Sequence, residues 1–160
     1  MTLTRTRPIF PLTAAVVLLS ATLVILAVRA QRPADPWTTA QTVQPAELQK
    51  ELASGKSVPT VLFVGFQRLY DAGHIKGAQY HGTGANPEGL TEIKKWAEPI
   101  PRSTNLVIYC GCCPMDHCPN LRPAFVALRQ MGFTRLRVLI LPSSFAIDWA
   151  EKGLPYDRGQ

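Results

Sequence analysis

Three unbroken apolar runs, rich in β-branched residues, constrain the fold more than any other feature of this sequence. They read TVLFVGF at residues 60–66, NLVIY at residues 105–109 and RVLIL at residues 137–141. Runs of this length without polar alternation are typical of strands that are covered on both faces. We therefore predict three central strands of one buried sheet.

Segments with helical spacing separate these runs. Leu48 and Leu52 lie four residues apart after Pro45, and residues 90–96 form a second candidate helix. Residues 121–128 repeat apolar side chains at helical spacing, with Asn120 as the expected N-cap, and a last short helix is expected around residues 145–152. Strands that alternate with helices predict an α/β domain, a parallel sheet flanked by helices.

The composition supports one packed domain and argues against nucleic acid as a partner. Hydrophobic residues make up 46% of the 160 residues and charged residues 18%, which suits one core but not two full domains. The net charge of +6 is concentrated near the N-terminus, where Arg5, Arg7 and Arg29 flank an apolar run. From residue 31 onward, 14 basic residues stand against 11 acidic ones, scattered without a basic run.

The apolar run at the N-terminus predicts a membrane address. Residues 9–28 carry no charge, and as a helix these 20 positions would extend ~30 Å, the thickness of a bilayer's hydrocarbon core. Basic residues before the run favour a cytoplasmic N-terminus, so the domain is expected in the periplasm or on the outer face of the inner membrane. The sequence leaves open whether the segment anchors the protein or is cleaved after Ala30. We expect a signal or anchor at residues 1–30, a linker at 31–41 and the α/β domain at 42–160.

All four cysteines fall within nine consecutive residues. A disulfide framework spreads its cysteines along the chain, so Cys110, Cys112, Cys113 and Cys118 indicate chemistry instead. They lie between the strand that ends at Tyr109 and the helix that begins near Leu121, where open parallel sheets form their sites. Backbone amides and the positive end of that helix are expected to lower the pKa of Cys110 and to hold a thiolate or a substrate oxyanion there.

Several ordered segments resemble the single-domain rhodanese-like family. Residues 70–78 read YDAGHIKGA, close to the family's Y-x-x-G-H-I-x-G-A segment, and VIYC at residues 107–110 matches the strand that delivers the nucleophilic cysteine. Gly132-Phe133 and WAEKGLPY at residues 149–156 match its later segments. The resemblance implies a rhodanese-like sheet and a sulfurtransferase without a cofactor. In such an enzyme Cys110 carries sulfane sulfur as a persulfide from a donor such as thiosulfate to a thiol or cyanide.

Two departures from the family pattern concern the site itself. The family usually has D-V-R at the end of its second strand, where this chain has Phe63-Val64-Gly65. The segment after Cys110 is also longer than usual and reads GCCPMDHCPN. Because of these two departures, the shape of the active loop is not predicted.

The sequence also disfavours phosphate-ester chemistry, because no arginine lies six residues after Cys110, Cys112 or Cys113.

Three chemistries stay open for the loop. In the first, Cys110 carries the persulfide and another loop cysteine resolves or protects it; in the second, two thiols exchange disulfides with a thioredoxin-like partner. In the third, a soft metal such as Cu(I) or Zn(II) is bound. The candidate ligands are Cys110, Cys112, Cys113, His117 and Cys118. The whole candidate loop comprises Gly111, Cys112, Cys113, Pro114, Met115, Asp116, His117 and Cys118.

The sequence also suggests roles for two residues outside the cysteine loop. Arg122, in the first turn of the helix after the loop, is a candidate for binding an anionic donor. His74, in the G-H-I-x-G-A segment, is expected to hydrogen-bond and pack its turn rather than to act as a base.

Overall fold

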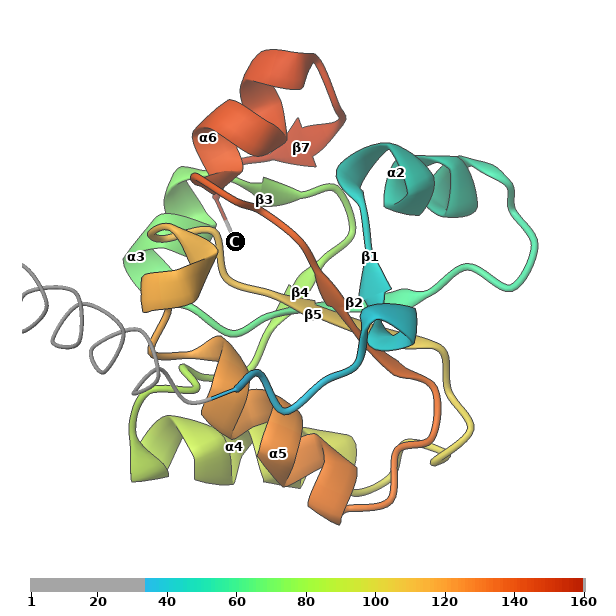
Figure 1. Cartoon of the computed structure of the whole chain (residues 1–160), viewed down its shortest axis with the longest axis vertical. Helices are drawn as coiled ribbons and strands as arrows, with labels where there is room; N and C mark the ends of the chain where they lie inside the picture. The colour runs from blue at the N-terminus through green and yellow to red at the C-terminus, as the bar shows by residue number, and fades with distance from the viewer. Residues whose placement is uncertain (1–33, 160) are drawn as a thin grey trace, which may run out of the picture. The chain divides into compact units, whose positions relative to one another are not determined.

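A five-stranded parallel sheet forms the centre of the domain in the computed structural model, which describes residues 34–159. The strand order is β1-β6-β5-β2-β4, so β5 has a neighbour on each side (Figure 1). The strands are Thr42–Val43 (β1), Thr60–Phe63 (β2), Gln79–Tyr80 (β4), Leu106–Tyr109 (β5) and Leu136–Leu139 (β6). All four pairings are parallel, which confirms the predicted α/β architecture.

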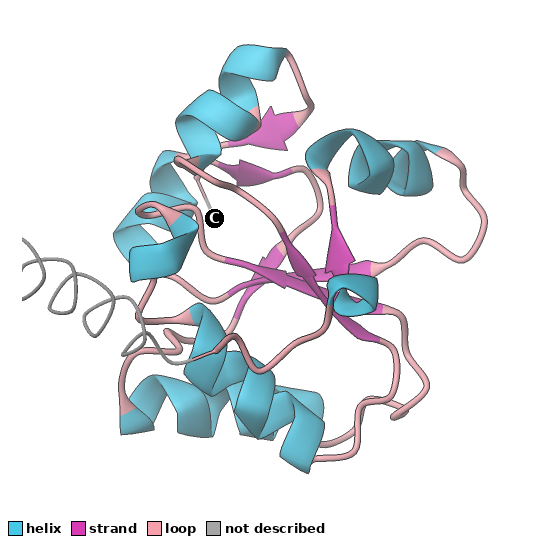
Figure 2. Ribbon diagram, viewed as in Figure 1, coloured by secondary structure: helices cyan, strands magenta, loops and turns pink. Residues whose placement is uncertain are grey.

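Helices cover both faces of this sheet, as Figure 2 shows in cyan. Helices α4 (Pro87–Ala97) and α5 (Leu121–Gln130) lie on one side, and α2 (Pro45–Ala53), α3 (Gln67–Ala72) and α6 (Phe145–Asp148) on the other. Alternate strand residues feed the two layers: Leu62 and Ile108 pack toward α4 and α5, whereas Val61 and Val107 pack in the opposite core. This double burial explains why the strands read as unbroken apolar runs.

A smaller antiparallel pair sits beside the main sheet. Strand β3 (His74–Ile75) pairs with β7 (Tyr156–Asp157), which brings the last strand back to the middle of the chain. His74 is buried, its Nδ1 lies 2.8 Å from the Tyr70 carbonyl oxygen, and its ring stacks on that of Tyr70 at 3.8 Å. These contacts agree with the predicted packing role of His74.

The elements differ from the prediction mainly at their ends. The run at residues 60–66 forms a strand only as far as Phe63, and the last helix is divided at Trp149 into α6 and a 3-10 turn, Ala150–Lys152. Trp37, within the predicted linker, is buried with its ring 5.4 Å from that of Phe125 on α5. The end of that linker therefore contributes to the core.

The predicted signal or anchor segment, including its hydrophobic helix, lies outside the described residues. Within residues 34–159, no helix combines the length and the apolar character that crossing a bilayer requires.

Candidate active site

Cys110 lies at the carboxyl end of β5, directly after Tyr109. It is 1% exposed, and its Sγ is 3.0 Å from Cys112 Sγ. Gly111 makes this approach possible, because its φ of +72° is in the left-handed region and a Cβ there would lie 2.7 Å from Phe145 Cβ. Any other residue at position 111 would be strained and would clash with α6.

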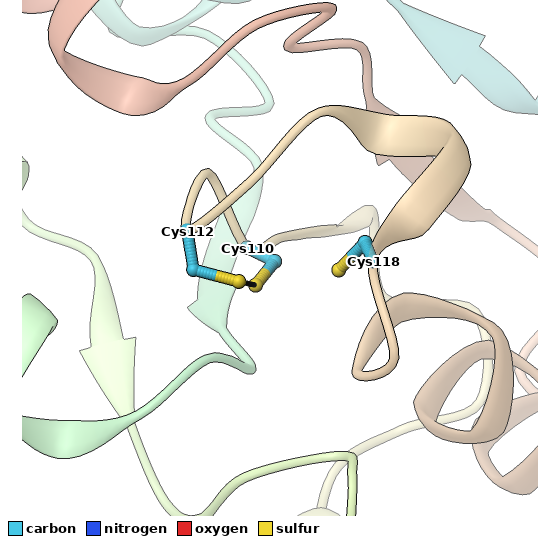
Figure 3. A group of neighbouring side chains, drawn as sticks. All are labelled: Cys110, Cys112 and Cys118. Atoms are coloured by element: carbon cyan, nitrogen blue, oxygen red, sulfur yellow. Dashed lines mark hydrogen bonds between the residues drawn. The ribbon is translucent and has the colours of Figure 1, made fainter.

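The long loop folds back so that a third sulfur joins this pair. A 3-10 turn, Met115–His117 (η2), reverses the chain, and Cys118 follows it with its backbone N–H bonded to the Met115 carbonyl oxygen. The Sγ atoms of Cys110, Cys112 and Cys118 all lie within 4.8 Å of one another (Figure 3). We call these three residues the trithiol cluster. Cys113 Sγ is 3.4 Å from Cys112 Sγ but lies outside the cluster.

Asn120 ties the cluster to the rest of the domain. It is 0% exposed, and its Nδ2 donates to Cys110 Sγ at 3.3 Å and to Cys112 Sγ at 3.7 Å. Its Oδ1 accepts a hydrogen bond from Thr83 Oγ1 at 2.6 Å. Asn120 precedes α5 as predicted, but its side chain makes no capping hydrogen bond because it is bonded to the site instead.

The pKa that is lowered in the cluster is that of Cys118, not that of Cys110 as the sequence predicted. Hydrogen bonding from Cys110 and the backbone N–H groups of Asn120 and Leu121 lower the pKa of Cys118 to about 6, against the opposing effect of burial. Hydrogen bonding with Cys118 and burial raise the pKa of Cys110. The expected lowering of the Cys110 pKa is therefore wrong for the reduced cluster, since the amides at the start of α5 bind Cys118. Burial and Cys112 raise the pKa of Cys113 to about 12.

A cleft of about 270 Å³ leads to two of the sulfurs. Cys110, Gly111 and Cys112 line it from the loop, and the end of β2, α3, α6 with the turn after it and the C-terminal segment supply the remaining walls. Those walls are mostly apolar, with Phe63, Phe145 and Tyr156 among them, while Arg158 contributes a positive charge. Cys110 thus lines the cleft although it is almost fully buried, and Arg158 is a site residue that sequence reasoning missed.

Comparison with solved structures identifies the fold that carries this site. No known family model and no curated protein matches the sequence. The rhodanese-like domain of the Anabaena sp. protein Alr3790 matches 74% of this chain and 79% of its own at 21% identity, with a TM-score of 0.54. BH2092 from Bacillus halodurans matches 87% of this chain and 86% of its own at 16% identity, with a TM-score of 0.58.

The chain has a rhodanese-like fold. A third match is EanB, in a structure described as a cysteine persulfide with ergothioneine. It is 20% identical over 73% of this chain and 28% of the EanB chain, with a TM-score of 0.54. At these identities the likeness concerns the fold, and the chemistry has to be argued from this chain's own residues.

At the end of β2, this rhodanese-like chain has Phe63, Val64 and Gly65 in place of the family's usual D-V-R residues. Phe63 and Val64 are buried, and a Cβ at Gly65 would lie 2.5 Å from Phe63 Cζ and 3.1 Å from Cys110 Sγ. The Phe63 ring and the Cys110 sulfur thus occupy the space that a side chain at position 65 would need. The charged groups of that strand end are replaced by an aromatic wall.

Three other predicted residues, Cys113, His117 and Arg122, do not belong to the trithiol cluster. The His117 side chain is 69% exposed and its Nδ1 is 2.7 Å from Asp116 Oδ1, so the described structure places neither His117 nor Cys113 among the clustered metal ligands. Arg122 pairs with Asp35 at 2.6 Å and donates to the Cys118 carbonyl oxygen at 3.3 Å. It does not line the cleft, and its contacts give it a role in holding the loop.

Proposed function

We propose that this protein is a sulfurtransferase that carries sulfane sulfur as a persulfide on Cys110. The observation that carries the proposal is the position of Cys110: a thiol at the end of the central strand of a rhodanese-like fold, lining a cleft of about 270 Å³. The cleft suits a small donor, and Arg158 in its wall suits a donor with negative charge.

In the first step, the Cys110 sulfur attacks the outer sulfur of a donor such as thiosulfate. A new S–S bond forms to Cys110 while the S–S bond of the donor breaks, and its electron pair leaves with sulfite. The Cys110 proton leaves with the sulfite, which takes it up as hydrogen sulfite. The transfer needs no external oxidant, because the sulfane sulfur moves without a net change in oxidation state.

In the second step, a thiolate or cyanide attacks the outer sulfur of the persulfide. The S–S bond to Cys110 breaks, its electron pair returns to Cys110, and the acceptor leaves as a persulfide or as thiocyanate. The Asn120 amide and the backbone N–H of Cys112 face the Cys110 sulfur and stabilise the negative charge that returns to it. The structure of EanB, described with a cysteine persulfide, gives precedent for such a species on a related fold.

One contact favours a second candidate function, thiol-disulfide exchange. The sulfurs of Cys110 and Cys112 lie 3.0 Å apart. Oxidation of this pair by the disulfide of a thioredoxin-like partner would remove two protons and two electrons from the two thiols and reduce the partner.

The experiment that separates the two functions measures intact mass. The reduced full chain is freed of reductant and incubated with thiosulfate, and its intact mass is then measured by mass spectrometry. Cys110→Ser is the test variant, and Cys113→Ser is the matched control. We expect the native chain and the control to gain one sulfur atom and release sulfite, and Cys110→Ser to gain none. Sulfur transfer that survives in Cys110→Ser would refute the assignment. Dithiol exchange would be assigned instead if thiosulfate adds no sulfur to the native chain and a parallel incubation with the disulfide of a thioredoxin-like partner removes two hydrogens from it.

We also propose that the domain works outside the cytoplasm, attached to the membrane or released from it by cleavage. The support is the uncharged run at residues 9–28 and the basic residues before it. A reporter enzyme that is active only outside the cytoplasm, fused to the C-terminus of the full chain, should be active. An inactive reporter on a stable fusion would exclude this location.

A further inference from the structure

The third sulfur of the trithiol cluster goes beyond what sulfur transfer requires. A persulfide carrier needs one cysteine, yet Cys110, Cys112 and Cys118 place three Sγ atoms within 4.8 Å of one another. Two of the three, Cys110 and Cys118, are buried, and Cys112 is half-buried. Three converging thiols in a mostly buried position form a ligand set for a thiophilic ion.

We infer that the trithiol cluster binds one soft monovalent cation, with Cu(I) as its representative. The donors in the cluster are all sulfur, which favours soft cations over hard ones. Zn(II) in a structural site takes four ligands, whereas three sulfurs converge here. His117 is bonded to Asp116 at the surface, and the Cys113 sulfur, 3.4 Å from that of Cys112, is not among the three that lie within 4.8 Å of one another.

The spacing of the sulfurs suits three-coordinate binding. An ion ~2.3 Å from each of three sulfurs, in their plane, holds those sulfurs ~4.0 Å apart. The three Sγ atoms fit within 4.8 Å, and the Cys110–Cys112 distance of 3.0 Å has to widen by roughly 1 Å. Cys112 can make this shift because it is half-buried and directly follows the turn at Gly111.

The surroundings compensate the negative charge that three thiolates bring to one ion. The Asn120 amide donates to the sulfurs of Cys110 and Cys112, and the backbone N–H groups of Asn120 and Leu121 point to Cys118. Each ligating thiol releases its proton to solvent, and the copper stays Cu(I) throughout, so no electron is transferred. Hydrogen bonds to ligating sulfurs are the usual way in which a protein stabilises a thiolate-bound metal.

An entry path exists on the cleft side. Cys110 and Cys112 line the cleft of about 270 Å³, whereas Cys118, the residue after η2, does not line it. An ion would meet the first two sulfurs from the cleft and then reach the third. If the proposed sulfur transfer is correct, a bound ion also blocks it, since the same Cys110 sulfur cannot bind copper and attack a donor.

The test titrates the reduced full chain with Cu(I) in competition with a chromophoric Cu(I) chelator, under anaerobic conditions. Cys110→Ser, Cys112→Ser and Cys118→Ser each remove one ligand, and Cys113→Ser is the matched control. We expect one Cu(I) per chain for the native protein and for the control, and affinity at least roughly tenfold weaker for each of the other variants. X-ray absorption should show three sulfur neighbours and no nitrogen.

Several outcomes would overturn the inference. These are a Cys113→Ser loss as large as the Cys118→Ser loss, an unchanged affinity in Cys118→Ser, or Zn(II) bound as tightly as Cu(I) through four ligands. Circular dichroism and thermal unfolding of the metal-free variants separate loss of a ligand from loss of the fold. The two proposals fail separately: copper binding in a chain that never accepts sulfur refutes sulfur transfer alone, and sulfur transfer unaffected by excess Cu(I) refutes the metal site alone.

Discussion

Strands β2 and β5 lie side by side and end at the same edge of the sheet, yet the two ends have opposite chemistry. Phe63 pairs in register with Tyr109, and the next residues, Val64 and Cys110, begin the two diverging segments. After β2 the chain presents buried apolar residues and a glycine; after β5 it presents a loop with four thiols. The comparison shows that the fold sets the position of a site, whereas the segments after the strands set its chemistry.

The largest effect is expected from removing the aromatic wall at the end of β2. Phe63 is buried and its ring packs on those of Tyr70, Tyr80 and Tyr109. Phe63→Ala should lower the free energy of unfolding by about 3–5 kcal/mol, because it opens a cavity in the core. Urea unfolding measures this loss. Phe66→Ala, at an exposed position of the same segment, is the control and should change little.

A smaller change at the same strand end tests whether β2 and Cys110 are in contact. Gly65→Ala places a Cβ against Phe63 and the Cys110 sulfur, so we expect a loss of about 1–3 kcal/mol in unfolding free energy through overpacking. Persulfide formation should fall as well, because Cys110 is displaced. Gly73→Ala is the control, since its Cβ would meet Phe145 at an ordinary 3.4 Å. Equal effects of the two substitutions would contradict the close approach of Gly65 to Cys110.

On the β5 side, Asn120 is the residue that connects the thiols to the domain. Asn120→Ala removes the donor to two sulfurs and the acceptor for Thr83, so it should lower the free energy of unfolding by about 1 kcal/mol. It should also slow persulfide formation, which mass spectrometry follows with time. Asn120→Asp keeps the acceptor for Thr83 but places a carboxylate beside the thiols. If Asn120→Asp transfers sulfur as fast as the native chain, the amide has no part in the chemistry.

The smallest effect is expected far from both strand ends. Arg137 holds Glu51 in a paired contact of 2.6 and 2.8 Å, and hydrogen bonding from Arg137 lowers the Glu51 pKa. The stabilisation is present above the unfolded-state pKa of the carboxyl group and is lost as the pH falls through its lower folded-state pKa. Glu51→Gln should cost ~0.5 kcal/mol at neutral pH and less in acid, with sulfur transfer unchanged. A cost that grows in acid would reverse the assigned sign.

The parts that the sequence predicts are those with a local pattern. The strand that ends at Tyr109 and the helix after the loop follow from unbroken or periodic apolar residues, and with them the position of Cys110. Helix α3 was missed because none of its residues is buried, so it has no apolar stripe, and strands of two residues such as β1 and β7 are too short for a period. Cys118 returns to Cys110 through the η2 turn, and Asn120 is held in place by its hydrogen bond with Thr83, 37 residues away in the sequence. Neither feature leaves a local signal in the sequence.

All four cysteines belong to one loop whose ends are fixed by β5 and α5. A cross-link between any two of them closes a ring of at most nine residues and connects no separate parts of the core, so it constrains the unfolded chain by roughly 2–3 kcal/mol, less than a long-range disulfide would. Redox changes and folding are thereby only weakly coupled in this protein. Oxidation of the loop should shift the melting temperature of the sheet by several degrees without deciding whether the sheet forms, so the sulfurs can react without endangering the architecture that presents them.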